Sequence, residues 1–368
     1  MAGALVHEWI AQDGGSENVL QEMSETFPDA DVLCLWNDSV GRFEDAHVRE
    51  SVLARTPLRR HKAAALPLMP AVWRTFRDRG YDWALISSHA FAHHLRLRGA
   101  PSGFRRMVYV HTPARYVWTR SEDTRGNHPL ARFVSHGLRP LDRRRARQGA
   151  EFAANSRYVR QRIQDTWGVD ARVIHPPVRV ERIQSVGDWR DHLDTTESDL
   201  VASLPEGFVL GASRFIPYKR LPDVIRVGEL TGRPVVLAGH GPDLAELRAT
   251  ADRATVPVQV IVAPSSALLY ALFQRTALYV FPAVEDFGIM PVEAMAAGAP
   301  VLAQARGGAA ESVLTGRTGA LVGFDSDDEI RAGVEIAIAT RPEDRRARAR
   351  EFGTGRFREE LRTWVAAG

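Results

Sequence analysis

Two carboxylates, Glu285 and Glu293, are separated by seven intervening residues within the segment 281–297, which reads FPAVEDFGIMPVEAMAA. The apolar run 277–281 before them predicts a buried parallel strand. Pro291 predicts the first turn of a helix, because its missing N–H would be unpaired there in any case. We therefore expect Glu285 in a loop between strand and helix, and Glu293 in the first helical turn.

This arrangement suits a sugar nucleotide. A helix N-terminus and free backbone N–H groups, here those of Phe287 and Gly288, favour a diphosphate. One carboxylate can accept two hydrogen bonds from a ribose diol, and the other can face a hexose or a developing positive charge. The alternative is that Glu285 is a solvated loop residue and that Glu293 only complements the helix dipole.

Two cations follow another expected strand. Arg214 ends the strand 208–214, and Lys219 lies in the loop that leads into the expected helix 221–230. The fork of an arginine and the point charge of a lysine both suit a diphosphate. Lys219 stands out because only it and Lys62 are lysines among the 48 basic residues.

The N-terminal region begins with an expected strand over residues 3–10, a turn, and a helix over 19–27. Gly14 and Gly15 in the turn let the backbone approach a phosphate. Glu17 complements the helix dipole. A plain tight turn explains the same two glycines.

His111 ends the expected strand 106–111, at the edge where open α/β sheets bind ligands. It opens the run His111-Thr-Pro-x-Arg115-Tyr-x-Trp118. A lone histidine in such a place is more often structural, so the whole run gives His111 its functional weight.

Together these motifs resemble those of the retaining glycosyltransferases of family 4 (glycosyltransferase group 1). The matches stand in the family's order: Gly14-Gly15, His111, Arg214 with Lys219, Glu285-x7-Glu293, and Gly307-Gly308. The run that opens at His111 resembles that of a branch that includes bacterial mannosyltransferases. The resemblance implies an α/β fold, GT-B, in which two Rossmann-like domains face each other across a cleft. It implies an acceptor-side domain over 1–176, joined by the C-terminal helix 355–368, and a donor-binding domain over 177–354.

The resemblance also implies roles for the residues. Arg214 and Lys219 are expected to stabilise the departing diphosphate, and Glu293 to hold the ribose. Glu285 is expected to hold the hexose with the backbone around it, and His111 to position that sugar. The remaining expected contacts are Gly14, Gly15, Phe287, Gly288 and Ile289 to the donor, and Glu17, Arg115 and Trp118 to the acceptor.

The implied reaction transfers a hexose, with mannose from GDP-mannose as the first expectation and UDP-sugars close behind. The acceptor is a hydroxyl of a glycan, a lipid-linked saccharide or a natural product. A sugar-nucleotide epimerase of the same fold and a noncatalytic sugar-nucleotide-binding protein remain alternatives. A nicotinamide oxidoreductase is weakly supported, since Gly239-x-Gly241 lacks a near third glycine. No metal or cofactor is expected, because Arg214, Lys219 and the helix dipole neutralise the leaving group.

Length and composition fit an ordinary globular protein. A chain of 368 residues predicts two domains. The single cysteine, Cys34, excludes a disulfide framework and is expected as a buried strand thiol. No signal peptide and no apolar run of about 20 residues is visible, so we expect a cytoplasmic protein. The sequence contains no feature that indicates the oligomeric state.

Several polar segments have open interpretations. Residues 55–80 alternate basic and apolar positions, which fits either peripheral contact with the inner face of an anionic membrane or a solvated arginine-rich helix face. The arginines of 138–149 predict a surface helix rather than a nucleic-acid site, because no aromatic interleaving accompanies them. His89, His93 and His94 suggest a metal, but no carboxylate or cysteine cluster stands nearby in sequence, so polar loop and helix positions are favoured. Asp325-Ser-Asp327 predicts a helix start.

The connections between the domains are the least informative part. Residues 151–156 are expected to form the last strand of the first domain, and 171–178 an extended connector stiffened by two prolines. Residues 179–206 are expected to be a polar, variable surface.

Overall fold

The computed structural model describes residues 2–12, 14–39, 41–43, 46–118 and 129–367, with the side chains of 129–136 outside that description. The chain divides into two compact units. Unit 1 comprises Met1–Pro177 and Gly355–Gly368, and unit 2 comprises Val178–Thr354. The assignment of acceptor to one unit and donor to the other stays a prediction.

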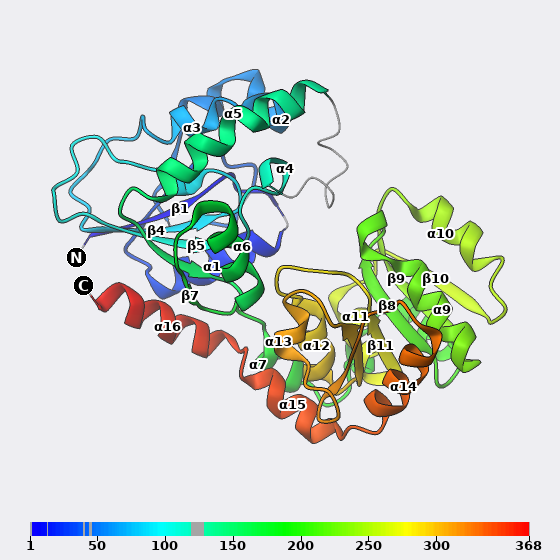
Figure 1. Cartoon of the computed structure of the whole chain (residues 1–368). Coiled ribbons are helices and arrows are strands. Elements are labelled where there is room, and N and C mark those ends of the chain that lie inside the picture. Colours follow the sequence, from blue (N-terminus) through cyan, green and yellow to red (C-terminus); the bar gives the residue numbers. More distant parts are fainter. Residues whose placement is uncertain (1, 13, 40, 44–45, 119–128, 368) are drawn as a thin grey trace. The chain divides into compact units, whose positions relative to one another are not determined.

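Unit 1 is built on a parallel sheet of seven strands in the order β3-β2-β1-β4-β5-β6-β7 (Figure 1). Its central strands are buried along their whole length because helices cover both faces of the sheet. The strands are β1 (Gly3–His7), β2 (Asp31–Cys34), β3 (Val48–Glu50), β4 (Trp83–Ser88), β5 (Arg105–Val110), β6 (Glu151–Ala154) and β7 (Arg172–Val173).

The helices of unit 1 form two layers. One hydrophobic cluster joins α1 and α16 to one face of the sheet, and a second joins α2, α3, α4, α5 and α6 to the other. The helices are α1 (Gly15–Thr26), α2 (Lys62–Ala65), α3 (Met69–Val72), α4 (Arg115–Trp118), α5 (Pro129–Ala146), α6 (Arg157–Trp167) and α16 (Thr354–Ala366). Cys34 is buried in this core, as its strand position predicts.

The C-terminal helix α16 packs in unit 1, against residues that are distant from it in sequence. Its Trp364 is fully buried and donates from Nε1 to Glu151 Oε2 at 2.9 Å. Arg358 pairs with Glu22 on α1 at 2.6 Å. These contacts tie the last helix to the first domain of the chain (Figure 1).

Unit 2 carries a second parallel sheet, of six strands in the order β10-β9-β8-β11-β12-β13. Its strands are β8 (Val209–Arg214), β9 (Val235–His240), β10 (Val258–Val262), β11 (Leu278–Phe281), β12 (Val301–Gln304) and β13 (Gly319–Val322). Its helices are α7 (Val180–Gln184), α8 (Thr195–Ser203), α9 (Leu221–Thr231), α10 (Leu244–Ala251), α11 (Ser266–Arg275), α12 (Ile289–Ala297), α13 (Ala309–Ser312), α14 (Asp327–Ile338) and α15 (Pro342–Arg350). As predicted, Asp327 stands at a helix start, where it pairs with Arg226.

Two expectations about the connecting segments are wrong. The strand at 151–156 is not the last of its sheet, because Arg172–Val173 adds β7 beside β6. Residues 179–206 are not a polar surface, because α7, the 3-10 helix Trp189–His192 and α8 bury Ile183, Trp189 and Val201, respectively, in the core of unit 2. Sparse apolar residues at the right spacing anchor this segment despite its polar composition.

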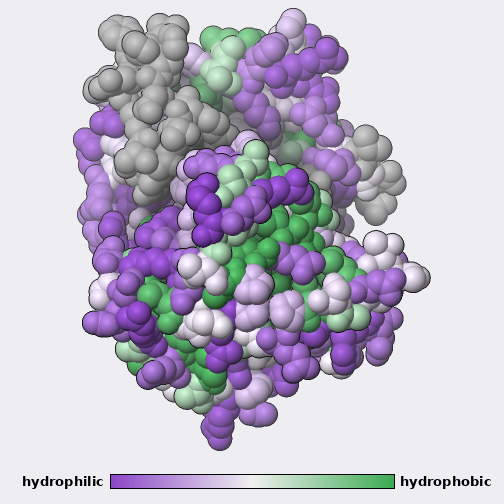
Figure 2. Space-filling model, turned by 90° about the vertical axis from the view of Figure 1, so that its right-hand side faces the viewer, coloured by the Kyte–Doolittle hydropathy of each residue, from purple (hydrophilic) through white to green (hydrophobic). Residues whose placement is uncertain are grey.

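The segment 55–80 does not form one amphipathic helix. It divides into short helices, among them the 3-10 helix Pro57–Arg60, α2 and α3, and it buries Met69 and Trp73 in the core. Among the described residues, no helix is long and apolar enough to cross a membrane. The face drawn in Figure 2 carries mostly hydrophilic residues around a central hydrophobic area.

Candidate active site

Two of the predicted site loops of unit 2 leave the same edge of its sheet. β8 and β11 are parallel neighbours, with Val209 opposite Leu278, so their carboxyl ends point the same way. β8 continues into the 3-10 helix Pro217–Lys219 and then α9, and β11 continues through a loop into α12. This topology brings Lys219 and Glu285 together although 66 positions separate them.

Lys219 Nζ forms an ion pair with Glu285 Oε1. Both side chains are largely buried, with 11% and 17% of their surfaces exposed. Tyr218 lies between the two predicted cations. Its hydroxyl accepts a hydrogen bond from Arg214 Nη2 at 3.2 Å, and its ring lies 5.2 Å from Lys219 Nζ. The structure therefore gathers Arg214, Lys219 and Glu285 into one polar group.

The loop that carries Glu285 is supported by the Gly307-Gly308 turn. Gly308 N donates to Glu285 O at 2.8 Å. A Cβ on Gly308 would lie 2.3 Å from Asp286 O, so only glycine fits this close approach. Gly288 precedes α12 with a φ of 88°, in the left-handed region that glycine favours. The glycines of the motif thus set the backbone of the loop.

Glu293 does not lie in the first turn of its helix as predicted. α12 begins at Ile289, ahead of Pro291, so Glu293 is the fifth helical residue. Its half-buried carboxyl accepts a hydrogen bond from Tyr270 on α11. Burial raises the pKa of Glu293 to about 7, against the opposing effects of Tyr270 and Arg179. A group with this pKa exchanges a proton near neutrality and accepts hydrogen bonds fully only when ionised.

In unit 1, His111 lies directly after β5 and shares a serine with a second histidine. Ser87 Oγ lies 2.8 Å from His111 Nε2 and 3.0 Å from His7 Nδ1. Burial, together with the nearby His89, lowers the pKa of His111 to about 3, so the imidazole is neutral at pH 7. Ser87 has a single hydroxyl proton, so at least one of the two histidines donates to it.

The predicted acceptor residue Glu17 turns back onto its own loop. Its carboxylate is buried and accepts hydrogen bonds from Ala11 N at 3.3 Å and from Ser16 Oγ at 2.8 Å. A Cβ on Gly14 would lie 2.0 Å from Glu17 Oε2. Gly14 therefore makes room for the carboxylate, and Gly15 begins α1.

The other two predicted acceptor residues, Arg115 and Trp118, form the ends of the short helix α4, where both are half-buried. Trp118 Nε1 donates to Asp142 Oδ2 at 2.7 Å. The guanidinium groups of Arg139 and Arg143 lie 5.5 and 5.3 Å from the Trp118 ring. These contacts hold α4 against α5 and give Trp118 a structural part.

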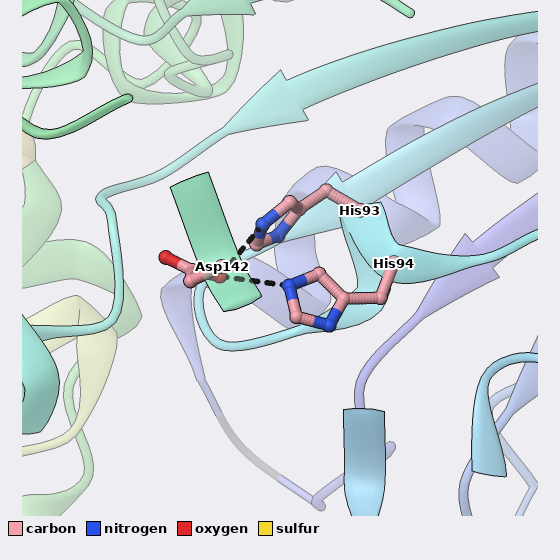
Figure 3. A group of neighbouring side chains, drawn as sticks. All are labelled: His93, His94 and Asp142. Carbon is pink, nitrogen blue, oxygen red and sulfur yellow. Dashed lines mark hydrogen bonds and ion pairs between the residues drawn. The ribbon is translucent and has the colours of Figure 1, made fainter. Parts of the chain in front are cut away.

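His93 and His94 are not polar loop positions, because both point at the buried carboxylate of Asp142 (Figure 3). Their Nε2 atoms lie 3.0 and 2.8 Å from Asp142 Oδ1. Trp167 Nε1 donates to Oδ2 at 2.7 Å, as Trp118 does. Burial alone would raise the pKa of Asp142, but His93 and His94 hold it below its usual value.

These three ligand atoms lie within 4.8 Å of one another, the spacing of a metal site. However, His94 and Asp142 are already engaged in hydrogen bonds, whereas His93 Nε2 is buried without a hydrogen-bond partner among the described residues. Arg145 Nη1 donates to His94 Nδ1 at 3.1 Å, which leaves the proton on Nε2 for Asp142. The arginine charge also opposes a divalent cation. We conclude that the cluster is a structural hydrogen-bonding group that joins α5 to its neighbours.

Several of these contacts were missed from the sequence. Tyr270 on α11 and Arg179, just before α7, flank Glu293, Ser87 on β4 reaches His111 after the neighbouring strand β5, and Asp142 on α5 reaches His94 on a packed 3-10 helix. None stands in a local motif with its partner. For Asp142, the unusual position of an acid among the arginines of α5 was the available signal.

Two family models match most of the chain. The family described as "Glycosyltransferase Family 4" matches residues 13–182, and the family described as "Glycosyl transferases group 1" matches residues 196–355. The first match falls almost wholly in unit 1 and the second in unit 2. Both agree with the resemblance drawn from the motifs.

Relatives with known roles match over part of their length. The D-inositol 3-phosphate glycosyltransferase of Mycobacterium avium is 35% identical over 166 residues, which cover 42% of this chain and 38% of the relative. The GDP-mannose-dependent alpha-(1-6)-phosphatidylinositol monomannoside mannosyltransferase of Mycolicibacterium smegmatis is 30% identical over 206 residues, or 50% of this chain and 52% of the relative. The chain thus spans about half, or less, of these relatives.

Solved structures match over the whole chain. The sucrose-phosphate synthase of Thermosynechococcus elongatus has a TM-score of 0.70 at 16% identity, with 100% of both chains covered. Anabaena Alr3699/HepE in complex with UDP-glucose has a TM-score of 0.68 at 18% identity, again with 100% of both chains covered. These likenesses confirm the expected GT-B fold with two Rossmann-like domains.

Proposed function

This chain belongs to the glycosyltransferases of family 4, and from that premise we propose that it transfers a hexose from a nucleoside diphosphate sugar to an acceptor hydroxyl. The observation that carries the proposal is the group formed by Arg214, Lys219 and Glu285 at the carboxyl edge of the unit 2 sheet. It combines cations for a diphosphate with a carboxylate for sugar hydroxyls, at the edge where parallel sheets bind ligands.

Each residue of the group has a part in the proposed reaction. Arg214 and Lys219 stabilise the diphosphate as it leaves. Glu285, with the backbone N–H groups of Phe287, Gly288 and Ile289, holds the hexose. Glu293 accepts hydrogen bonds from the ribose, and His111 positions a hydroxyl of the sugar as a neutral imidazole.

The proposed course retains the anomeric configuration by attack on the same face from which the diphosphate departs. The acceptor oxygen forms the new bond to the anomeric carbon, the bond to the phosphate oxygen breaks, and that oxygen takes the acceptor proton. The cations of this site neutralise the leaving group, so the proposal includes no metal.

GDP-mannose is the donor that we propose first, because the run from His111 to Trp118 resembles the mannosyltransferase branch and one relative is named as GDP-mannose-dependent. A UDP-sugar is the second candidate, because Anabaena Alr3699/HepE was solved with UDP-glucose. The proposed acceptor is a hydroxyl of a glycan, a lipid-linked saccharide or a natural product.

The test follows the fate of GDP-mannose and UDP-glucose by NMR, with and without a panel of acceptors. The proposal expects acceptor-dependent release of nucleoside diphosphate and a new α-glycosidic signal. Lys219→Ala should lower this turnover, whereas Arg253→Ala, an exposed arginine of unit 2, should not. A changed sugar released without acceptor would instead identify an epimerase, and binding without any product would identify a noncatalytic protein.

A further inference from the structure

A basic cavity lies in unit 1, outside the residues to which the proposed reaction assigns a part. Two 3-10 helices, Val52–Arg55 and Pro57–Arg60, form most of its wall, together with Asp38 and His61. Its volume is about 740 Å³. This space is large enough for a phosphate ester and its substituent.

The arginines around the cavity differ in whether they are paired with a carboxylate. Arg59 Nε lies 2.7 Å from Asp38 Oδ1, and its Nη2 donates to Asn37 O, so this arginine is both fixed and neutralised. Arg55 and Arg60 are exposed, and neither side chain has a hydrogen bond or ion pair with the residues that the structure describes. The cavity therefore presents two guanidinium groups without a counter-ion among those residues.

The cavity lies near the carboxyl edge of the unit 1 sheet. Asp38 follows β2, the neighbour of β1. Lys62, just beyond the second 3-10 helix, lies with its Nζ 4.7 Å from the ring of Trp9. Trp9 contacts His89, with centroids 4.9 Å apart, and His89 lies 6.2 Å from His111. A continuous row of rings thus connects the basic segment with the histidine assigned to the sugar.

We propose that this cavity binds the phosphoryl group of a phosphorylated acceptor. The inference rests on the proposed function and gives its acceptor a chemical class. An arginine guanidinium group can bind two phosphate oxygens at once in a bidentate manner. The two guanidinium groups without a counter-ion among the described residues also match the negative charge of a phosphate ester. The ester has two sources, a free small molecule or a phospholipid headgroup. Val52 and Leu68, exposed by 63% and 47%, flank the basic residues and suit the second source.

The first experiment is a calorimetric titration of the whole protein with inorganic phosphate and with glycerol 3-phosphate. The double variant Arg55→Gln/Arg60→Gln should weaken binding about tenfold or more. Arg79→Gln, an exposed arginine at the opposite end of the sheet, before β4, should bind like the wild type. Asp38→Asn should bind more tightly, because it removes the one carboxylate that lines the cavity among the described residues and releases Arg59.

The second experiment separates the two sources by sedimentation with vesicles of phosphatidylglycerol and of phosphatidylcholine. Binding to the soluble ester alone indicates a free acceptor, and added binding to phosphatidylglycerol vesicles that the double variant loses indicates a headgroup. Absence of wild-type binding to any of these phosphates, equal loss in Arg79→Gln, or weaker binding by Asp38→Asn would overturn the proposal. In a parallel titration, all variants should bind GDP or UDP with the affinity of the wild type. Absence of nucleotide binding by the wild-type protein would contradict the proposed function, independently of the result for the cavity.

Discussion

The ammonium group of Lys219 is paired with the carboxylate of Glu285, the residue expected to hold the hexose. The pair links the diphosphate-binding and hexose-binding parts of the proposed donor site. A bound diphosphate must compete with the Glu285 carboxylate for the ammonium group of Lys219. Since both side chains are largely buried, this competition takes place where charge interactions are strong.

The pair predicts opposite effects of its two substitutions on binding of bare GDP or UDP. Lys219→Ala should weaken binding by about 1.5–3 kcal/mol, because it removes a charge-assisted contact to the diphosphate. Glu285→Gln should strengthen it, because it frees the cation, while turnover of the sugar nucleotide falls. Isothermal titration and kinetics measure both effects.

The matched control for this pair is Asp252→Asn, which removes an exposed carboxylate of unit 2. It should leave both binding and turnover unchanged. Weaker binding of the bare nucleotide by Glu285→Gln would contradict the competition between carboxylate and diphosphate.

The pKa of Glu293 predicts a pH dependence of stability. Its folded value of about 7 lies above the ordinary value of 4.5, so the protonated carboxyl is favoured in the fold. This contribution is fully present below about pH 4.5 and is lost as the pH rises through 7, at most about 3 kcal/mol. Urea unfolding between pH 5 and 8 should show the loss, and Glu293→Gln should remove that part of the slope. An unchanged slope in the variant would refute the assignment.

The close approach of Gly308 to the Glu285 loop predicts that Gly308→Ala disturbs the site. Its methyl group would meet Asp286 O and Phe287 Cα at 2.3 and 2.4 Å, a clash that typically costs about 1–3 kcal/mol. Nucleotide affinity should therefore fall about tenfold. Gly355→Ala is the control, because no atom lies within 4 Å of its added methyl group. Wild-type affinity in a folded Gly308→Ala protein would show that the turn does not set the loop.

The hydrogen bonds that the Asp142 carboxylate accepts predict a large loss of stability for Asp142→Asn. The amide would place N–H donors against histidine and indole donors, at a cost of about 3–5 kcal/mol. Asp165→Asn, on the exposed side of α6, should change stability by less than about 0.5 kcal/mol. Equal midpoints of denaturation in the two variants would contradict the structural role.

The proposal of a metal-free reaction predicts that EDTA leaves turnover largely intact. The cations of Arg214 and Lys219 supply the neutralising charge, so removal of divalent ions should change the rate by less than about twofold. The assay compares initial rates with EDTA, with Mg²⁺ and with Mn²⁺. Complete loss that Mn²⁺ restores would require a metal in the mechanism.

The sequence predicted most of the parallel strands, because apolar runs such as 208–214 and 277–281 are long and bounded by loops. It did not predict β7, which has only two residues and so carries no pattern. It also missed the burial of Trp189, since that residue stands alone in a polar stretch. Periodicity identifies an element only where several residues repeat it.

Each half of the candidate site was visible as a local motif, but its contacts were not. Lys219 and Glu285 meet because β8 and β11 are neighbours, and strand order cannot be read from either motif alone. Asp142 was not linked to His94, 48 positions away, because the two meet only through the packing of α5 against the 3-10 helix Ala92–His94. The position of Glu293 along α12 depends on where the helix begins. Pro291 led us to expect a start later than Ile289, where the helix in fact begins.

The central claim is that unit 2 binds a nucleoside diphosphate sugar, and calorimetric titration of the wild-type protein with GDP, UDP, ADP and NAD⁺ tests it most directly. The account predicts a clear preference for GDP or UDP. The preferred nucleotide then decides whether GDP-mannose or a UDP-sugar is used as the donor in acceptor screening. Binding of NAD⁺ alone, or of none of the four, would contradict it.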